Sequence, residues 1–505
     1  MRSKKSVLNA MTSILMEVMG VLLAFLGRSV FIHVLSEEYL GINGLFSNIL
    51  TLLSMADMGL GSAIVFAMYK PMAEEDENKL NALLNLYAKI YTFVGVCVIT
   101  IGLLITPCLH FFIRDVDTVE NLRLIYSLYV LNTGISYFFV YKSSIINVAQ
   151  EGYILAINKF VFKVLQQIVQ IIFLLWTHNF IIYCFIMVIC TLLSNVSISL
   201  IANKKFPYIR KKTLTKVSKD ELKEIKKNCS AMIFHKVGDV VVNGTDNLLI
   251  ARFVNVIEVG LYSNYSMIIS NVLSMVNQIF FSIISSVGNF AVESNQESAK
   301  TLFENIFFIN SLIAGVSAAC LYNLLNPFII LWIGEEFLLS NCTVFLIVSV
   351  FYVQVIRQTA LTFKSAYGLF WNDRYKPLAE AAMNLSVSII LGRVWGINGV
   401  FIGTLFSIIG VCFWIEPYII YKNILNEKIK YYFLMVIKYT VINCLGIYLG
   451  HRLIEFFYIG GIKGIVFNLF LTIIVWGMIF SLACFRTKEF SWLLNKIFML
   501  LGIKK

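Results

Sequence analysis

The sequence contains few charged residues, and this scarcity excludes a soluble protein. Of its 505 residues only 14% are charged and 59% are hydrophobic, and the mean hydropathy is +0.80. A soluble chain has roughly a quarter of its residues charged. Apolar segments of about 20 residues recur along the whole chain, which is the length of a helix that crosses about 30 Å of hydrocarbon. Their helical period excludes the alternation of an outer-membrane barrel. We therefore predict an all-α polytopic membrane protein.

Motifs for enzymatic chemistry are also missing. The sequence has no Walker loop, no HExxH zinc motif and no GxSxG nucleophile motif. Its ten cysteines form no CxxC pair, so we predict no metal site, no cofactor and no disulfide framework. One DxD pattern, Asp115 to Asp117, falls on a predicted external loop. A glycosyltransferase would need this pattern within soluble cytoplasmic sequence, so we do not assign it that role. Large extracytoplasmic loops, typical of glycan polymerases and ligases, are absent. We expect a transporter, and no enzyme.

Hydropathy predicts about fourteen membrane spans. They run about 11–35, 41–69, 86–113, 122–146, 155–177, 180–202, 230–254, 258–288, 301–331, 342–368, 377–394, 396–420, 430–457 and 462–485. A count of twelve or thirteen stays open, because the long helices near residues 280 and 310 and the last two helices are less sharply bounded.

Lysine and arginine gather at three places: the N-terminal tip, the connection 203–229 and the tail after residue 485. The connection alone carries ten of them. All three lie on one side of the membrane if the span count is even, and that side is the cytoplasm. The opposite connections SEEY, THN and GEEF contain none. We predict a cell-membrane protein with both termini in the cytoplasm. Its net charge of +12 then faces anionic lipid headgroups, and no nucleic acid is needed to explain it.

Four sequence echoes indicate an internal repeat. GLFSN at Gly44–Asn48 returns as GLYSN at Gly260–Asn264. Three more follow in the same order: TPCLHFFI (106–113) with NPFIILWI (326–333), YKSSIINVAQEGY (141–153) with FKSAYGLFWNDRY (363–375), and Trp176 with Trp395. The offsets all lie between 216 and 222 residues. Four ordered matches at nearly one offset indicate a repeat of about 220 residues.

The repeat predicts two pseudo-symmetric six-helix lobes. Because six is an even number, both repeats keep the same orientation in the membrane, as in two-lobed transporters whose substrate path lies between the lobes. We predict four parts: an N-terminal lobe over 1–202, a basic cytoplasmic linker over 203–229, a C-terminal lobe over 230–425, and two additional helices with a basic tail over 426–505.

Ionisable residues inside the predicted spans are candidates for a transport site, because a charge in hydrocarbon is costly unless it faces a cavity or a partner. The candidate substrate-binding cations are Arg28, Lys142, Lys236, Arg357 and Lys364. The candidate ion-coupling acids are Asp57, Asp239 and Asp246. Lysine and arginine bind phosphates through charge-assisted hydrogen bonds, so the cations predict a phosphate or pyrophosphate substrate. The acids predict a proton or sodium site.

A purely structural role is open for several of these residues. Lys236 and Asp239 have i,i+3 spacing and may equally pair with each other. Six residues near predicted helix ends are candidates for reaching the lipid headgroups: Glu17, Lys142, Arg252, Lys364, Arg393 and Glu416. For Arg252, Arg393 and Glu416 we favour that role. Arg28 lies toward the outer third of its span, and both interpretations hold for it. Asp57, Asp246 and Arg357 are deep and lack a partner nearby in sequence.

Two stretches carry a family resemblance. EEYLGINGLFSNILTLLSMADMGLGSAIVFAMYKPMAEED (Glu37–Asp76) and WGINGVFIGT (Trp395–Thr404) resemble Wzx-type polysaccharide flippases of the multidrug/oligosaccharidyl-lipid/polysaccharide exporter superfamily. The resemblance implies that a polyprenyl-pyrophosphate-linked oligosaccharide moves from the cytoplasmic to the outer leaflet by alternating access, coupled to H+ or Na+. The lobe cations would bind the pyrophosphate and a polar cavity the sugars. Glycan polymerase machinery is an implied partner.

Related transporters predict different patterns. Flippases of lipid-linked peptidoglycan precursors have more arginine in the first helix, where this chain has only Arg28 within the body of the helix. A cation or multidrug exporter of the same superfamily needs an acid-rich cavity, whereas cations are as frequent as acids here. A glycan polymerase or ligase fits neither the short loops nor the twofold repeat. The GxxxG pattern at Gly399–Gly403 predicts close helix packing.

Overall fold

The computed structural model describes residues 16, 19–21, 23–35, 37–53, 60–111, 121–149, 151–210, 244–293, 296–369, 372–457 and 459–500. Within these ranges the regular structure is helical, and none of them contains a strand. Eight helices in the described part of the chain are long and apolar enough to cross a membrane, or up to nine if a bent helix pair counts as one span. The prediction of an all-α polytopic membrane protein is confirmed, and the count of fourteen spans stays a prediction.

The chain divides into two compact units, one up to Gly260 and one from Leu261 onward. The predicted lobe boundaries at 202, 229 and 425 stay predictions. Besides helical stretches over 23–34 and 244–253, the first unit contains α2 (Glu37–Leu53), α3 (Leu60–Ala73), α4 (Glu77–Ile105), η2 (Thr106–Phe111), α5 (Leu122–Tyr137), α6 (Val140–Val148), α7 (Gly152–Thr177), α8 (Phe180–Lys205) and η4 (Pro207–Arg210).

The second unit begins within α10 (Val256–Glu293) and continues with α11 (Gln296–Ile333), η5 (Glu335–Phe337), α12 (Asn341–Ile356), α13 (Gln358–Ala366), α14 (Lys376–Ser407), the π-helical segment η7 (Ile408–Cys412), α15 (Phe413–Ile420), the π-helical segment η8 (Tyr421–Leu425), α16 (Lys430–Phe456), α17 (Gly461–Cys484) and α18 (Lys488–Leu500). These bounds lie within a few residues of the predicted spans wherever both exist.

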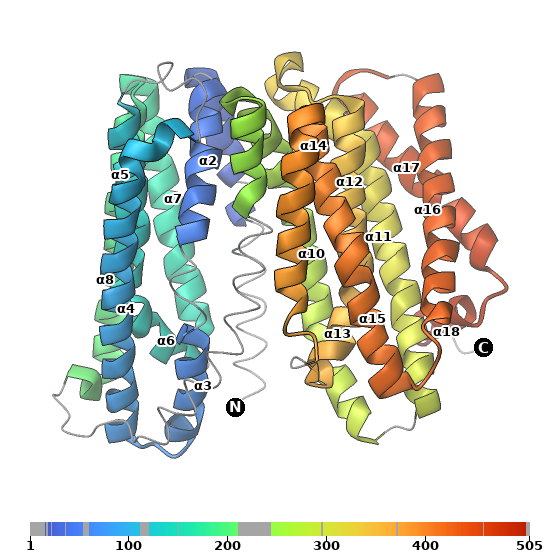
Figure 1. Cartoon of the computed structure of the whole chain (residues 1–505), viewed down its shortest axis with the longest axis horizontal. Helices are drawn as coiled ribbons and strands as arrows, with labels where there is room; N and C mark the ends of the chain where they lie inside the picture. The colour runs from blue at the N-terminus through green and yellow to red at the C-terminus, as the bar shows by residue number, and fades with distance from the viewer. Residues whose placement is uncertain are drawn as a thin grey trace. The chain divides into compact units, whose positions relative to one another are not determined.

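Polar side chains join neighbouring helices of the first unit. Helices α7 and α8 run side by side (Figure 1). The Asn158 amide on α7 donates to the Ser194 hydroxyl on α8 at 3.0 Å and accepts from the Ser197 hydroxyl at 2.8 Å. Such bonds, together with small residues that let backbones approach, hold helices together where hydrocarbon provides no hydrophobic drive. Gly95 on α4 is a close-approach site of this kind, because a Cβ there would lie 3.2 Å from the Gly134 carbonyl oxygen of α5.

Each unit contains one helix that is broken at the same place in the repeat. In the first unit α5 and α6 meet at an angle of 42°. In the second unit α12 stops at Ile356 and α13 begins at Gln358. Lys142 on α6 and Lys364 on α13 are equivalent in the repeat, at an offset of 222 residues, so the two breaks correspond.

Residues 376–425 form two consecutive helical arms, and the chain reverses direction between them at Gly396. This glycine has φ 57° and ψ −133°, a conformation open mainly to glycine. Asn384 donates to the Thr404 hydroxyl at 3.0 Å, although the two residues would be about 30 Å apart in a straight helix. The segment is therefore a hairpin, as the separate predicted spans 377–394 and 396–420 require. The close packing predicted at Gly399–Gly403 is confirmed, since a Cβ on Gly403 would lie 2.6 Å from the Ser388 nitrogen.

The two C-terminal helices α16 and α17 pack on α11 within the second unit (Figure 1). Asn443 on α16 donates to the Ser311 carbonyl oxygen of α11 and accepts from the Trp476 indole of α17, both at 3.2 Å. Gly315 leaves room for this amide, because a Cβ there would lie 2.0 Å from the Asn443 oxygen. The additional helices are thus attached through a buried polar contact as well as through apolar packing.

Candidate functional site

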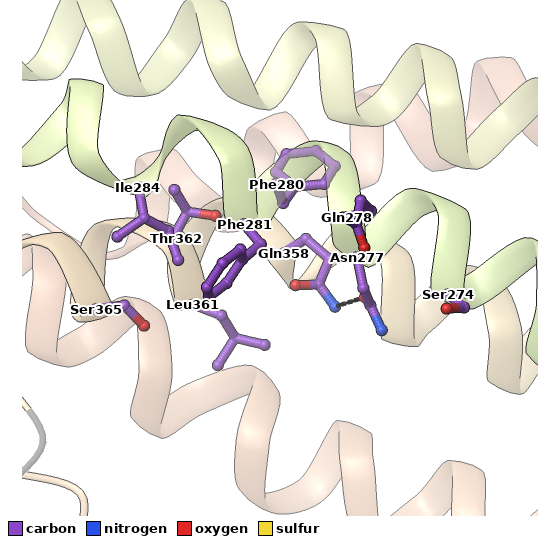
Figure 2. A pocket seen from close by; sticks show the side chains of 10 residues that line it. All are labelled: Ser274, Asn277, Gln278, Phe280, Phe281, Ile284, Gln358, Leu361, Thr362 and Ser365. Carbon is purple, nitrogen blue, oxygen red and sulfur yellow. Dashed lines mark hydrogen bonds between the residues drawn. The ribbon is translucent and has the colours of Figure 1, made fainter. Parts of the chain in front are cut away.

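A cavity of about 410 Å³ lies between α10 and α13, entirely within the second unit (Figure 2). Ten residues line it: Ser274, Asn277, Gln278, Phe280, Phe281 and Ile284 from α10, and Gln358, Leu361, Thr362 and Ser365 from α13. Most of them fall on stripes at i, i+3, i+4 and i+7, which place side chains on one face of a helix. The cavity is therefore formed by two helix faces that meet at the broken helix.

The lining is uncharged and mixed, with six residues that carry an amide or a hydroxyl and four apolar residues, Phe280, Phe281, Ile284 and Leu361. The Gln358 amide donates to the Asn277 oxygen at 2.8 Å and so joins the two walls, as Figure 2 shows. None of the ten lining residues is an acid or a base. Amide side chains are costly against hydrocarbon, so a helix face that exposes Asn277 and Gln278 is suited to a water-filled path. The site favours neutral polar groups over ions.

A buried charged network adjoins the cavity in the sequence, because Arg357 immediately precedes the lining residue Gln358. The Arg357 guanidinium donates two hydrogen bonds to the Glu416 carboxylate, from Nε at 2.9 Å and from NH2 at 2.6 Å. Lys376 Nζ donates to the same carboxylate at 2.6 Å. Glu380 lies 3.9 Å from Arg357. Two cations and two carboxylates thus offset each other, and Glu416 is 0% exposed.

The network joins points where the helices are irregular. At the break, the Asn310 amide of α11 donates to the Ile356 carbonyl oxygen at 2.9 Å and to the Thr359 hydroxyl at 3.0 Å. Glu416 lies on α15, a short helix with a π-helical segment on each side and with Pro417 inside it. Proline and π-helical turns both disturb the backbone hydrogen bonds of a helix. The charged contacts therefore join segments in which the regular hydrogen bonding of the α-helix is interrupted.

The prediction that Glu416 extends to the lipid headgroups is wrong. The helical run continues through η8 to Leu425, so Glu416 is not at its end, and the carboxylate is buried against Arg357 and Lys376. Arg357 was expected to be deep and without a partner nearby in sequence. Its partner is 59 residues away. Arg252 and Arg393 are exposed close to a helix end or to the reversal, as a headgroup position requires.

The equivalent lysines of the two repeats are both buried and both have polar partners. Lys364 Nζ donates to Asp373 at 2.6 Å, and Lys142 Nζ donates to the Asn203 amide oxygen on α8 at 2.7 Å. The repeat equivalent of Asp373 is Glu151, which pairs with Lys205. The two lysines therefore differ in the charge of their partner, an acid in one unit and an amide in the other.

The remaining predicted residues lie in or near the first unit. Arg28, in the helical stretch 23–34, is half-buried and has the phenols of Tyr129 and Tyr183 as electrostatic neighbours. Asp246 is half-buried in the stretch 244–253. Asp57, Lys236 and Asp239 lie outside the described residues. Of the three predicted acids, Asp246 alone is among the described residues, and it belongs to the first unit.

Sequence reasoning missed the cavity residues and two members of the network, Lys376 and Glu380. A signal for the cavity was present: Ser274, Asn277 and Gln278 form a polar stripe at i, i+3 and i+4 within an apolar helix. Lys376 lies one residue before the predicted span 377–394, and Glu380 lies within that span.

The sequence model of the polysaccharide biosynthesis protein family matches residues 6–287, more than half of the chain. The chain belongs to this family. Among curated protein sequences, none matches it significantly. The resemblance to the multidrug/oligosaccharidyl-lipid/polysaccharide exporter superfamily is thereby confirmed at family level.

Solved structures of this superfamily share the fold. A lipid II flippase, MurJ, in an inward closed conformation is similar with a TM-score of 0.68 at 14% identity, over 94% of this chain and 98% of that chain. An inward-facing multidrug resistance MATE transporter gives 0.59 at 15% identity, over 79% and 94%. A MATE transporter from Vibrio cholerae gives 0.54 at 16% identity, over 80% and 94%. At these identities the similarity establishes the fold: a multi-pass membrane protein of transporter architecture.

Proposed function

We propose that this protein is a flippase that moves a polyprenyl-pyrophosphate-linked oligosaccharide repeat unit from the cytoplasmic to the outer leaflet by alternating access. The observation that carries the proposal is the uncharged lining of the α10–α13 cavity, which combines amides and hydroxyls with apolar side chains, in a member of the polysaccharide biosynthesis protein family. Such a lining suits sugar hydroxyl groups. An exporter of organic cations would need carboxylates there, and Asp and Glu are absent from the ten lining residues.

The extent of the structural match also supports a lipid-linked cargo. The lipid II flippase aligns with 94% of this chain, whereas the two multidrug transporters align with 79% and 80%. A lipid-linked cargo has three parts that need different surroundings. The sugars need a polar cavity, the pyrophosphate needs cations, and the polyprenyl chain needs access to the bilayer.

For the pyrophosphate we propose the five cations Arg28, Lys142, Lys236, Arg357 and Lys364 as candidate ligands. Arg357 is bound to the Glu416 carboxylate, Lys364 to the Asp373 carboxylate and Lys142 to the Asn203 amide oxygen. A pyrophosphate that binds any of these three would have to displace that partner or share the cation with it.

Asp57, Asp239 and Asp246 are the proposed carboxylates for coupling to H+ or Na+. Both termini are proposed to be cytoplasmic, with glycan polymerase machinery as a partner on the outer side. A reporter fused within 203–229 is expected to give a cytoplasmic signal, and an external signal there would contradict this topology.

Transport by the full-length protein in proteoliposomes tests the function. A fluorescent polyprenyl-pyrophosphate oligosaccharide should appear in the opposite leaflet, and Arg28→Ala should slow the transfer at least about tenfold, because one charge-assisted contact is worth roughly 1.5–3 kcal/mol. The control is Arg452→Ala, since Arg452 is exposed at the end of α16 and pairs with Glu455. Transport of an organic cation such as ethidium, without transfer of the lipid-linked oligosaccharide, would overturn the proposal in favour of a multidrug exporter.

A further inference from the structure

The cavity between α10 and α13 has a chemistry that selects among sugars. We propose that it is the subsite for one uncharged sugar residue of the cargo, and that it discriminates against acidic sugars. This inference rests on the proposed flippase function and adds the chemical class of the sugar at this position. It follows from the charge, the hydrogen-bonding capacity and the exposed aromatic surface of the lining.

The absence of cations among the lining residues disfavours an acidic sugar. A uronic acid or another carboxylate-bearing sugar that packs against this lining gives up part of its hydration and gains no compensating cation. The guanidinium of Arg357, which precedes the lining residue Gln358, is bound to Glu416 and is electrostatically offset. A neutral sugar carries only hydroxyl and acetamido groups, which amides and hydroxyls can match.

The amide pair retains hydrogen-bonding capacity for such groups. The bond from Gln358 to Asn277 uses one N–H of the first and one acceptor site of the second. Each amide has two donors and a carbonyl oxygen, so the Gln358 oxygen and the Asn277 amino group are available to a ligand. Thr362 and Ser365 add hydroxyls from the same face of α13. Groups that both donate and accept suit sugar hydroxyls, which do the same.

An exposed aromatic ring completes the subsite. Phe281 lines the cavity and is 75% exposed, so its ring has apolar surface free for a ligand. A pyranose ring has an apolar C–H face that packs against an aromatic ring while its hydroxyls point to the polar wall. Figure 2 shows Phe281 on the cavity side near Gln358 and Leu361. The cavity therefore offers one apolar and one polar surface, which is the arrangement that a neutral sugar ring needs.

The repeat indicates that this lining is specific to the second unit. At offsets of 216 and 222, the counterparts of Asn277, Gln278 and Gln358 are Gly61, Ser62 and Ser136. The first repeat therefore has no amide at these positions. Since the helical framework is shared but the amides are not, they are not required by the framework itself, which favours a role in binding.

Binding to the full-length protein in lipid nanodiscs tests the subsite. Three probes are compared: polyprenyl diphosphate alone, the same lipid bearing one N-acetylglucosamine, and the same lipid bearing one glucuronic acid. The N-acetylglucosamine probe should bind roughly tenfold more tightly than the bare lipid, since one or two net hydrogen bonds are worth about 1–2 kcal/mol. The glucuronic acid probe should bind no more tightly than the bare lipid.

Variants separate this subsite from the flippase function itself. Asn277→Leu and Gln358→Leu should each reduce binding of the N-acetylglucosamine probe to the level of the bare lipid. Gln358→Lys should shift the preference toward the glucuronic acid probe. The matched control is Gln166→Leu, which removes the amide–amide bond of 3.2 Å between Gln166 and Gln170 on α7 of the first unit and should leave all three affinities unchanged.

The outcomes are distinguishable. If all three probes bind equally and the Asn277 and Gln358 variants bind like the wild type, the sugar subsite is wrong while the flippase proposal stands. If the glucuronic acid probe binds most tightly to the wild type, the selectivity for neutral sugars is wrong. If no probe binds at all, the proposed function fails together with the subsite.

Discussion

The two broken helices occupy equivalent places in the repeat and are held in different ways. In the first unit, α5 and α6 meet at 42°, and Ile135 stands at the position equivalent to Arg357. In the second unit, α12 and α13 meet at Arg357, which is bound to Glu416. One break thus has an apolar residue at the position where the other has a buried arginine.

This difference indicates that the same helical framework is stabilised by different interactions at its two breaks. A buried ion network costs desolvation energy, and replacing it with apolar residues is often neutral for stability. Among the described residues, the network is present at one of the two equivalent breaks. We therefore infer that it fixes the geometry of this break more than it adds to stability. It fixes the position of α13 and, with it, the side of the cavity that contains Gln358.

We expect the largest loss of stability from removing Glu416, the carboxylate at the centre of the charged network. Glu416→Leu leaves Arg357 and Lys376 as buried cations without their shared carboxylate, and should lower the free energy of unfolding by about 3–5 kcal/mol. Thermal unfolding of the purified protein in nanodiscs measures this loss. In the first unit, Ile135→Met changes only apolar volume at the equivalent position and should cost less than about 1.5 kcal/mol.

A second substitution distinguishes lost charge balance from lost packing. Adding Arg357→Met to Glu416→Leu leaves Lys376 and Glu380, which are four residues apart on α14, to offset each other. The double variant should therefore regain much of the lost stability. A double variant as unstable as Glu416→Leu alone would contradict this account of the second break.

An intermediate effect compares the equivalent lysines. Lys364→Met leaves the buried carboxylate of Asp373 without its lysine, whereas Lys142→Met leaves only the Asn203 amide oxygen without a donor. Removing the lysine of a buried carboxylate costs more than removing the donor to an amide oxygen, so the loss should be about 2 kcal/mol greater for Lys364→Met. Chemical unfolding of both variants under one condition gives the difference. Equal losses would show that the two lysines are held equivalently despite their different partners.

The smallest expected effect compares two carboxylate–lysine bonds of equal length in the second unit. Lys300 donates to Glu427 at 2.6 Å, as Lys376 does to Glu416, but the first two side chains are 38% and 30% exposed, whereas that of Glu416 is 0% exposed. Glu427→Gln should leave the melting temperature at pH 7 unchanged within error, because water screens exposed pairs.

The Lys300 hydrogen bond lowers the pKa of Glu427 below its ordinary value. The small contribution of this pair is therefore present above the ordinary carboxyl pKa and disappears as the pH falls through the lowered value. Melting curves of the wild type and of Glu427→Gln should coincide at acidic pH. A large difference at neutral pH would contradict the distinction between buried and exposed pairs.

Much of the fold was predictable because long apolar runs define helices directly. The span predicted at 155–177 is α7 (Gly152–Thr177), and the span predicted at 430–457 is α16 (Lys430–Phe456). The reversal at Gly396 and the tight contact at Gly403 were predictable too, since glycine is needed where a helix turns back or where two helices touch.

The site was less predictable, because its contacts join distant residues. Hydropathy gives no sign that Arg357 pairs with Glu416, or that the helix carrying Glu416 continues to Leu425 through π-helical turns. Averaging hydropathy over a sequence window reveals a span, but the average hides single amide residues such as Asn277 within that span. The roles assigned to Arg28, Lys236 and the three aspartates stay predictions, since nothing yet separates binding from structural support at these residues.

The hairpin at Gly396 has a consequence for biogenesis. Its two arms satisfy each other's polar groups, since Asn384 donates to Thr404 and the Ser388 hydroxyl donates to the Val400 carbonyl oxygen. Arms that pair while leaving the translocon would not present these groups singly to acyl chains. Residues 376–425 are thus suited to enter the bilayer together, as one pre-folded module during synthesis.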